Sequence, residues 1–424
     1  MGIRHLNRFI QTKCPNASSR IHLEQLRGKK IAVDTSIYMY RFAGESALLE
    51  NMYLMASLFR YYDINAVFVF DGMPPPQKTE LIESRRRKKD QAKQQYDIVA
   101  DQLKQRKRTE YYNSEIAELE ETMTQLRKKF ARLRECDIEN VKDLLISFGF
   151  AIIDAEGEAD VLCAKLAIKK RVYACLSDDT DMFVYGCPVV LRHISLLNHS
   201  VVSYGMTELL TEIGISQHEF KMVCIVNGTD YDAPAEPVVA TGEDDRIFKI
   251  YDLLLEFKRL SPKDQKKYQD GGGFYDWLDE CKKGVLNTSG VISLMTNEAI
   301  FDISNNRSSG DQYKQLVILN RNDIHKRRIV ELMMKEDFIF IEPNPDDNQI
   351  LNTLSGGHGS FTTSPVYGVG VWETTPVSTP VSTPVSSVSS DDQVHIIANN
   401  VYGIDAGSFD ELNQKYIQIT RRRR

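Results

Sequence analysis

Carboxylates gather in two short stretches of this chain, and their spacing points to metal chemistry. The first stretch is Ala155–Asp160 and the second is Ser177–Asp181. Apolar runs at Phe150–Ile153 and Val172–Leu176 precede them, and Val161–Ala167 has an apolar helical pattern. This order of strand, acidic turn, helix, strand and acidic turn is a βαβ unit, and such sheets bind ligands at the carboxyl ends of their strands. The sequence therefore predicts a site at that edge of a parallel sheet.

The same design, an apolar run closed by a carboxylate, occurs twice earlier in the chain. Lys29–Asp34 ends in acid, and the apolar run within Ile64–Phe70 is followed at once by Asp71. A further acid, Asp230, follows the helical pattern of His218–Val226. The candidate metal ligands at strand ends, at helix starts and after this helix are Asp34, Asp71, Glu156, Glu158, Asp179, Asp181 and Asp230.

Convergence of these acids would require cations. Two carboxylates about 4 Å apart repel by about 4 kcal/mol at an effective dielectric near 20. Hard oxygen ligands favour Mg²⁺ or Mn²⁺ over zinc, and two such ions about 3.5–4 Å apart can clamp an in-line displacement at phosphorus. Taken singly, each acid is more often an ordinary helix cap or turn residue than a metal ligand. Their repetition at strand ends favours the metal site.

Composition limits the other possibilities. A chain of 424 residues with 42% hydrophobic content can form two or three domains around a sizeable core. The net charge of −6 does not indicate nucleic-acid binding by the whole surface, so local charge has to provide it. Seven cysteines without a Cys-x-x-Cys pair indicate free thiols in a reducing compartment, which we take to be the nucleus or cytoplasm. No apolar run of about 18 residues is present, so no membrane span is expected.

Residues 79–135 form the basic segment of the chain. From Arg85 to Arg134 there are fifteen Lys or Arg against eight Asp or Glu. We expect residues 80–108 to pair with the helix that follows, in a hairpin that projects from the sheet. A coiled-coil dimer with a second copy of the chain is the alternative. Either pairing would satisfy an apolar seam at three- and four-residue spacings, formed by Ile116, Leu119, Met123, Leu126, Phe130 and Leu133.

The chain divides into four expected parts. A core over residues 1–240 contains the 79–135 insertion, and a helical region follows at 241–350. Residues 351–392 are rich in Ser, Thr and Pro, with three tandem Thr-Pro-Val-Ser copies, and cannot bury enough surface to fold. A short tail at 393–424 ends in four arginines. These predict a weak nucleic-acid contact or an import signal, or only a solubilising end.

The order of the motifs resembles the flap endonuclease family, structure-specific 5′ nucleases that act on branched DNA. The motifs are Met1-Gly-Ile, Ile31-Ala-Val-Asp34, Val69-Phe-Asp-Gly-Met-Pro-Pro75, Glu156-Gly-Glu158, Asp179-Thr-Asp181 and Gly228-Thr-Asp-Tyr231. The resemblance implies an α/β fold, a parallel-sheet PIN-like nuclease core with helices on both faces, a helical arch and a divergent C-terminal region. It also implies phosphodiester hydrolysis with two Mg²⁺ ions, which Mn²⁺ can replace, and gives ligand roles to the seven acids above.

The resemblance also assigns the basic residues after the Asp-Gly-x-Pro-Pro motif. Lys78 and Arg85 occupy the positions that hold the scissile phosphate, a catalytic role, although a Lys/Arg-rich helix can also be a plain solvated face. The implied nucleic-acid contacts are Gly2, Tyr40, Arg86 and Arg87. For Tyr40, packing in the core remains as open as stacking on a base, since aromatic residues on helices mostly pack inward.

The function implied is Mg²⁺-dependent cleavage of branched or flapped DNA in replication, repair or recombination. A 5′–3′ exonuclease on RNA or DNA ends and a non-catalytic nucleic-acid scaffold are the alternatives. After Tyr231 the chain lacks the Gly-x-Gly turn that holds duplex DNA and potassium in the family, and Gln414–Ile419 lacks the paired aromatics of a sliding-clamp box. We expect DNA as the partner, no membrane, no clear clamp box and a monomer. The divergence outside the core is compatible with a member from a large DNA virus.

Overall fold

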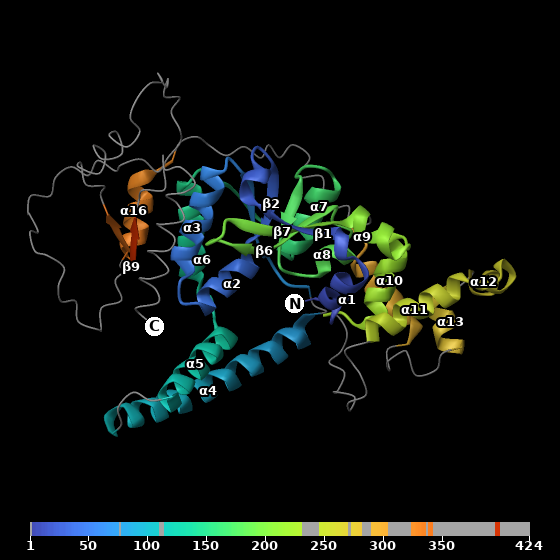
Figure 1. The fold of residues 1–424 in the computed structure, drawn as a ribbon, viewed down its shortest axis with the longest axis horizontal. Helices are drawn as coiled ribbons and strands as arrows, with labels where there is room; N and C mark the ends of the chain where they lie inside the picture. The colour runs from blue at the N-terminus through green and yellow to red at the C-terminus, as the bar shows by residue number, and fades with distance from the viewer. Residues whose placement is uncertain are drawn as a thin grey trace, which may run out of the picture.

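A seven-stranded sheet lies at the centre of the molecule (Figure 1). The computed structural model describes residues 2–75, 78–109, 114–230, 246–269, 273–281, 290–303, 324–335, 338–341 and 395–398. In spatial order the strands are β1 (Ser18–His22), β7 (Ser200–Gly205), β6 (Val189–Ser195), β5 (Ala174–Leu176), β2 (Lys30–Asp34), β3 (Asn65–Phe70) and β4 (Ala151–Asp154). The five strands from β6 to β4 run parallel, which confirms the predicted α/β core.

The two strands at one edge depart from the expected parallel pattern. β7 runs antiparallel to β6, and β1 runs antiparallel to β7, with Ile21 opposite Val201 and Ser19 opposite Ser203. Neither strand was expected. β1 contains mostly polar residues and is largely exposed. A polar strand gives little hydrophobic signal in the sequence, yet it suits the exposed edge of a sheet. The sheet is therefore mixed and mostly parallel.

Helices cover both faces of the sheet, and alternate strand residues supply the two cores. On one face Ile31, Val33 and Phe68 pack beneath α2 (Thr35–Gly44), α3 (Leu48–Tyr61), α6 (Glu135–Ser147) and α16 (Lys326–Met334). On the other face Ala32 and Val67 join the core beneath α1 (Leu6–Lys13), α7 (Ala159–Ile168), α8 (Asp181–Val184), α9 (Met206–Ile213) and α10 (Gln217–Asn227). The central strands are buried on both sides, as continuous apolar runs predict.

Two long helices form a hairpin that projects from the body in Figure 1. α4 spans Thr79–Thr109 and α5 spans Ser114–Phe130, and the two helices pack against each other. Ile116 and Leu126 of the predicted seam are buried, and the Phe130 ring lies 5.2 Å from the Tyr96 ring of α4. The hairpin prediction is confirmed. The seam has its partner within the chain, which removes the need for the coiled-coil dimer.

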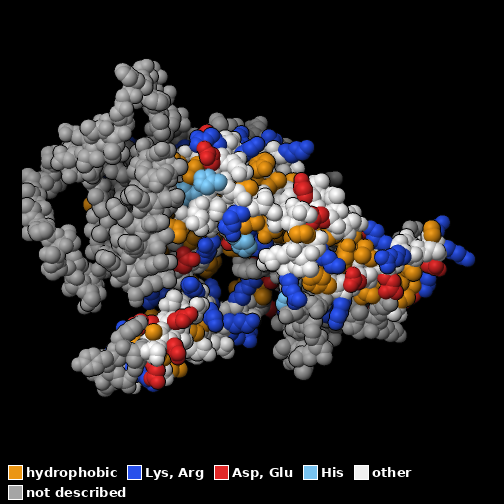
Figure 2. All heavy atoms as spheres, viewed as in Figure 1, with side chains coloured by type: hydrophobic (Ala, Val, Ile, Leu, Met, Phe, Trp, Pro, Cys, Tyr) orange, Lys and Arg blue, Asp and Glu red, His pale blue; other side chains and the backbone are white. Residues whose placement is uncertain are grey.

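The base of the hairpin is tied to α2. A Cβ atom added at Gly44 would lie 3.3 Å from the Lys128 Cα, so the two helices approach closely there. Arg127 donates one hydrogen bond to Ser46 Oγ at 3.2 Å and another to the Tyr96 hydroxyl at 3.0 Å. Figure 2 shows Lys and Arg side chains gathered where the hairpin meets the body. The hairpin therefore presents its positive charge beside the sheet rather than only at its free end.

The C-terminal elements pack on the same two cores. They comprise α11 (Arg246–Lys258), α12 (Pro262–Gln269), α13 (Phe274–Cys281), α14 (Val291–Ile300) and α16. Two turns of 3-10 helix, Pro15–Ala17 and Leu23–Leu26, lie near the N-terminus. Phe9 of α1 lies 5.2 Å from Phe248 of α11, and Ile329 and Leu332 of α16 are buried against the other face. The helical region expected at 241–350 thus contains α11 and α16, and both helices are anchored on the core.

A short parallel pair, β8 (Phe338–Ile341) and β9 (His395–Ala398), joins two segments that flank the expected linker. The pairing was not expected, since β9 falls in the region predicted as a simple tail. The expected linker at 351–392 and the four terminal arginines lie outside the described residues, as does the segment 231–245 that replaces the family's glycine turn. In the described part of the chain, no helix combines the length and apolarity needed to cross a membrane. All seven cysteines are free thiols, five of them buried.

Candidate active site

Three neighbouring parallel strands bring their carboxyl ends to one place. Asp34 is the last residue of β2, Asp71 follows β3 directly, and the acidic turn Ser177–Asp181 follows β5. Because β5, β2 and β3 are adjacent and parallel, these acids converge at the carboxyl ends of the strands. We call this end of the sheet the acidic edge. The sequence prediction of where the carboxylates meet thus agrees with the geometry.

Asp34 is buried at the centre of this group. Only 6% of its surface is exposed, and Ser177 donates a hydrogen bond from Oγ to its Oδ2 at 2.8 Å. Burial raises the pKa of Asp34 to about 7, and the negative charges of Asp71 and Asp179 add to the rise. A carboxylate placed so deeply among other carboxylates is costly without a cation nearby.

The turn after β5 carries two more buried acids, Asp179 and Asp181. Asp179 accepts the backbone N–H of Asp181 at 3.1 Å, and Asp181 is 1% exposed. Burial raises the pKa of Asp181 well above its usual range, and the charge of Asp179 raises it further. Burial also raises the pKa of Asp179. Asp181 Oδ1 is buried and has no hydrogen-bond partner, so this oxygen is available to a ligand.

The start of α7 contributes acids from the other side. Glu158 is the N-cap residue of α7, and Asp160 lies in its first turn. Asp71 Oδ1 accepts the backbone N–H of Ala159 at 2.8 Å, which ties the end of β3 to the start of this helix. Burial raises the pKa of Asp160 well above its usual range, followed by the charge of Glu158, and the charges of Asp179 and Asp34 also raise it. Asp160 therefore belongs to the acidic group, although the sequence analysis did not select it.

Glu156 does not join the group, contrary to the sequence prediction. Gly72 donates its N–H to Gly157 O at 2.7 Å, and Met73 donates to Glu156 O at 3.2 Å. A Cβ atom at Gly72 would lie 1.9 Å from Ala155 O, so the two loops touch through their backbones. This contact leaves the Glu156 side chain exposed, with Lys165 as the group that senses its charge. α7 begins at Ala159, so Glu158 is its N-cap and Asp160 lies in its first turn. The start of this helix therefore selects Glu158 and Asp160 as the pair of acids, in place of Glu156 and Glu158.

This difference predicts opposite outcomes for two neighbouring acids. Asp160→Asn should weaken metal binding and any cleavage activity by on the order of 10²-fold, as loss of a preorganised electrostatic group typically does. Glu156→Gln should leave both within about two-fold, since its exposed side chain gains little from screened interactions. Calorimetric Mn²⁺ titration with a nuclease assay on both variants checks the register. Equal losses in the two would contradict it.

Cations from the base of the hairpin occupy two of the acids. Lys78, which is 8% exposed, lies just before α4, and its Nζ is 2.7 Å from Glu158 Oε1. Arg85, in the second turn of α4, lies with Nη2 2.5 Å from Asp230 Oδ2. Asp230 follows α10, and its charge raises the pKa values of Asp179 and Asp181. The hairpin thus places two positive charges directly over the acidic edge.

Within the described residues no three acids are arranged as a ready metal-binding group. Lys78 and Arg85 each pair with one candidate ligand, Glu158 and Asp230. The donor set nevertheless fits a hard divalent cation: the oxygens are carboxylates, Asp181 Oδ1 lacks a partner, and burial together with mutual repulsion raises the pKa of Asp34, Asp160 and Asp181. A bound cation would relieve each of these penalties.

The remaining predicted contacts lie on or beside the hairpin. Tyr40 is 45% exposed on α2 and carries the Lys89 ammonium 4.4 Å above its ring, so it does not pack in the core. Arg86 and Arg87 are exposed on α4, and Arg87 pairs with Glu83 at 3.5 Å. These residues face solvent near the acidic edge. Their predicted role in nucleic-acid binding stays a prediction.

Gly2 lies against the acidic turn. A Cβ atom there would be 2.3 Å from Asp179 Oδ1, 2.4 Å from Thr180 Oγ1 and 2.5 Å from Asp181 Oδ1. Its φ of +81° also disfavours any other residue. Ile3 N–H donates to Thr180 Oγ1 at 2.7 Å, which fixes this approach. The predicted contact of Gly2 with DNA stays a prediction. In the structure, the Gly2 backbone lies against the candidate ligands Asp179 and Asp181.

Gly2→Ala should therefore displace Asp179 and Asp181. We expect at least a 10-fold loss of metal affinity, since groups that orient ligands typically contribute 10–100-fold. Gly28→Ala is the matched control, because Gly28 also has a positive φ of +70° but nothing within 4 Å of its added Cβ. Both variants should lose about 1–2 kcal/mol of stability from the backbone alone. Thermal unfolding measures that shared loss, and a metal affinity equal in the two would show that the Gly2 contact is unimportant.

Comparisons with known proteins agree on one family. The model of the XPG N-terminal domain matches residues 1–92, and the model of the XPG I-region matches residues 149–230. Flap endonuclease 1 of Leishmania major is 30% identical over 297 residues, which cover 65% of this chain and 71% of that protein. Flap endonuclease 1 of Leishmania braziliensis is 29% identical over 253 residues, covering 54% of this chain and 60% of that protein.

The chain therefore spans less than two thirds of the length of some of these relatives. Among solved structures, flap endonuclease-1 from Methanococcus jannaschii is 20% identical over 75% of this chain and 90% of that chain, with a TM-score of 0.47. The family models leave out residues 93–148, which contain most of the hairpin.

Proposed function

The chain belongs to the flap endonuclease family, and from this premise we propose that it is a metal-dependent 5′ nuclease that cleaves branched or flapped DNA. The observation that carries the proposal is the convergence of buried acids at one sheet edge beneath the paired cations Lys78 and Arg85. A purely structural arrangement would not collect so many carboxylates whose pKa values burial raises. Replication, repair or recombination would supply such substrates.

We propose that two Mg²⁺ ions, or Mn²⁺ in their place, bind at this edge. The residues that would hold them are Asp34, Asp71, Glu158, Asp160, Asp179, Asp181 and Asp230, with Glu156 left out. When bound, such ions activate water and neutralise charge on the attacking and leaving oxygens of an in-line displacement. The family is a class of nucleases that normally depends on metal, which agrees with this donor set.

The chain's own cations would act on the phosphate. Lys78 and Arg85, now paired with Glu158 and Asp230, would contact the scissile phosphodiester in a complex where metal holds these two carboxylates. Preorganised cations at that point neutralise the charge that develops on the phosphoryl oxygens. The exposed Arg86 and Arg87 on the same helix would contact the DNA backbone further out.

The substrate class follows from the hairpin. Its two helices stand off the body in Figure 1, and Lys78 and Arg85 at its base pair with acids of the site. A single strand carrying one charge per nucleotide fits this arrangement, since its backbone can reach the acids and metal while the hairpin neutralises it. We propose that the enzyme is a monomer, because the hairpin seam is already paired internally. The seven free thiols support a location in the nucleus or cytoplasm.

Cleavage of labelled substrates tests the proposal. In Mg²⁺, a 5′-flap DNA should be cut near the junction, and the same flap with a blocked 5′ end should still be cut. Cleavage only of free ends, in DNA or in RNA, would indicate an exonuclease instead. Binding without any cleavage in Mg²⁺ or Mn²⁺ would indicate a nucleic-acid scaffold and would overturn the proposal.

A further inference from the structure

Arg192 is a buried arginine with no carboxylate partner among the residues that the structure describes. Its side chain is 2% exposed, within the core of the sheet beside Phe183 and Tyr204. Nη1 donates to Asn7 Oδ1 at 2.5 Å, and Nη2 donates to the backbone carbonyl of Asp178 at 2.6 Å. Both acceptors are neutral, and Nε has no partner. A buried charge without a counter-ion is costly, so this guanidinium needs negative charge in its surroundings.

The carbonyl that Arg192 Nη2 binds belongs to Asp178, one residue before the candidate ligand Asp179. Asp178 precedes Asp179 and Asp181, two buried acids of the site. The carbonyl that Arg192 binds is thus the first peptide group of the candidate ligand turn. Arg192 thus binds the main chain of this turn and not one of its candidate ligands. It contacts no ligand carboxylate directly, so it cannot compete with a metal.

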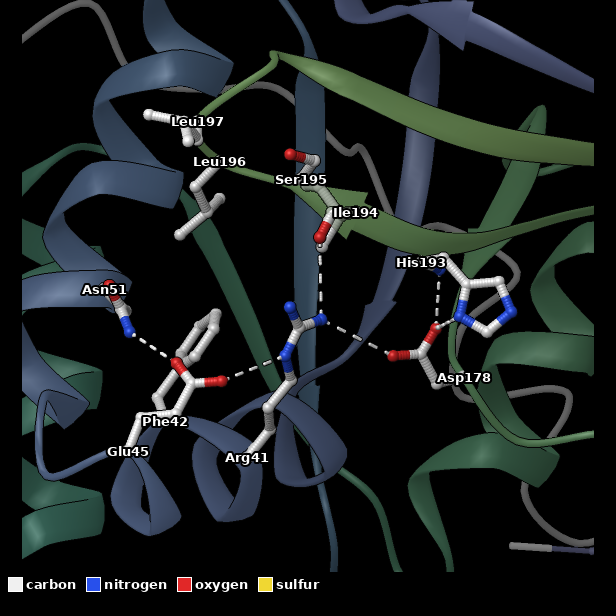
Figure 3. A pocket seen from close by; sticks show the side chains of 10 residues that line it. All are labelled: Arg41, Phe42, Glu45, Asn51, Asp178, His193, Ile194, Ser195, Leu196 and Leu197. Atoms are coloured by element: carbon white, nitrogen blue, oxygen red, sulfur yellow. Dashed lines mark hydrogen bonds and ion pairs between the residues drawn. The ribbon is translucent and has the colours of Figure 1, made fainter. Parts of the chain in front are cut away.

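The side chain of Asp178 fixes the same point a second time (Figure 3). Its Oδ1 accepts the backbone N–H of His193 at 2.7 Å, and its Oδ2 lies 3.7 Å from Arg41 Nη1 on α2. His193 Nδ1 lies 3.6 Å from the same Oδ1. Asp178 is therefore held by its carbonyl through Arg192 and by its carboxylate through β6 and α2.

An irregularity in β6 makes this double hold geometrically feasible. The register between β6 and β7 shifts between Arg192 and Ser195, and His193 has a φ of 55°. In a regular strand, consecutive residues present their groups to opposite faces. The bulge instead lets the Arg192 side chain and the His193 N–H both reach Asp178. Bulges that re-aim groups next to functional sites are a recurrent feature of sheets.

The other bond of Arg192 reaches the N-terminal segment. Asn7 lies on α1, just after Gly2 and Ile3, whose backbones press against Asp179, Thr180 and Asp181. One guanidinium thus bridges the two pieces of chain that meet at the ligand turn.

We propose that Arg192 is a positioning residue for the metal site, a role that rests on the proposed function. It sets the Asp178–Asp181 turn against α1 through its two donors, to Asn7 and to the Asp178 carbonyl. Outer residues of this kind typically contribute 10–100-fold to metal affinity. Loss of Arg192 should therefore weaken metal binding even though no ligand is changed.

The experiment measures Mn²⁺ affinity of the full-length chain by electron paramagnetic resonance, well below the unfolding temperature. Arg192→Gln, which removes the charge and the pair of guanidinium donors, should lower the affinity about 10–100-fold. Arg192→Lys keeps the charge but cannot bridge both acceptors, so its affinity should fall between Arg192→Gln and the wild type. If Arg192→Gln does not fold, the Lys variant alone decides: an affinity equal to the wild type would overturn the proposal.

Arg60→Gln is the matched control. Arg60 also donates to a main-chain carbonyl, Phe148 O at 2.7 Å, and lies 4.8 Å above the Phe150 ring, but it packs between α3 and the α6–β4 connection. It should lose thermal stability without losing Mn²⁺ affinity. Losses of affinity that are equal in the Arg60 and Arg192 variants would mean a general structural effect and overturn the inference. A wild-type chain that binds no Mn²⁺ would instead refute the proposed function.

Discussion

Asp181→Ala should abolish DNA cleavage in Mg²⁺ while leaving DNA affinity within a few-fold of the wild type. Asp181 is 1% exposed, and its Oδ1 has no partner in the protein, so we expect it to bind metal directly. The loss should be on the order of 10³-fold or more, at the upper end of what removing one preorganised group costs. DNA affinity should hold or rise slightly, because the substitution removes negative charge near the phosphates.

Asp154→Ala is the control for this prediction. Asp154 ends β4 at the same edge of the sheet, but it is exposed and paired with Lys142. Its removal should leave the cleavage rate unchanged within about two-fold, since exposed ion pairs contribute little. Single-turnover rates with enzyme in excess separate chemistry from binding for both variants. Wild-type turnover by Asp181→Ala would show that the acidic edge is not the metal site.

The second large effect concerns the base of the hairpin. The double change Lys78→Ala and Arg85→Ala should slow cleavage by about 10²-fold or more, through loss of preorganised cations at the phosphate. Sequence alone suggests that metal binding is unaffected, since neither residue is a ligand. The pairs with Glu158 and Asp230 change that expectation, because each carboxylate loses a cation that competes with the metal. Mn²⁺ affinity should therefore rise in the double variant while cleavage falls.

The double change Arg106→Ala and Lys107→Ala provides the comparison. These two cations of the same helix pair with Glu115 and Glu120 of α5, away from the acidic edge. Their loss removes the same charge from the hairpin and should lower the salt dependence of DNA binding in a similar way. Cleavage by bound enzyme should stay within about three-fold of the wild type, as exposed pairs are worth little. Equal slowing in both double variants would mean that Lys78 and Arg85 act only by general attraction.

The sequence predicted the parts of the site that depend on parallel strands. Asp34 and Asp71 end apolar runs, and chain direction alone brings such ends together. The hairpin was equally accessible, because the seam through Ile116 and Leu126 required a partner and the basic segment beside it was the nearest one. Both inferences use periodicity, which the sequence carries directly.

Other features depend on contacts that periodicity does not encode. Whether Glu156 or Asp160 joins the acids is decided by the backbone contact of Gly72 with Ala155 and Gly157, a meeting of two distant loops. The ion pairs of Lys78 and Arg85 and the bridge made by Arg192 likewise join residues about 80 or more positions apart. The polar strand β1 gave no hydrophobic signal because it lies at an exposed edge. Tertiary packing determines each of these, and one sequence does not reveal it.

Crystals of the full-length chain soaked in Mn²⁺ and measured at the manganese absorption edge would test the central claim most directly. We expect two anomalous peaks about 3.5–4 Å apart, with Lys78 and Arg85 no longer bonded to Glu158 and Asp230. The peaks should lie among the seven proposed ligands, Asp34, Asp71, Glu158, Asp160, Asp179, Asp181 and Asp230. Glu156 should remain outside the coordination sphere. Absence of any peak at this edge of the sheet, in crystals that diffract well enough to show the carboxylates, would contradict the assignment of the site.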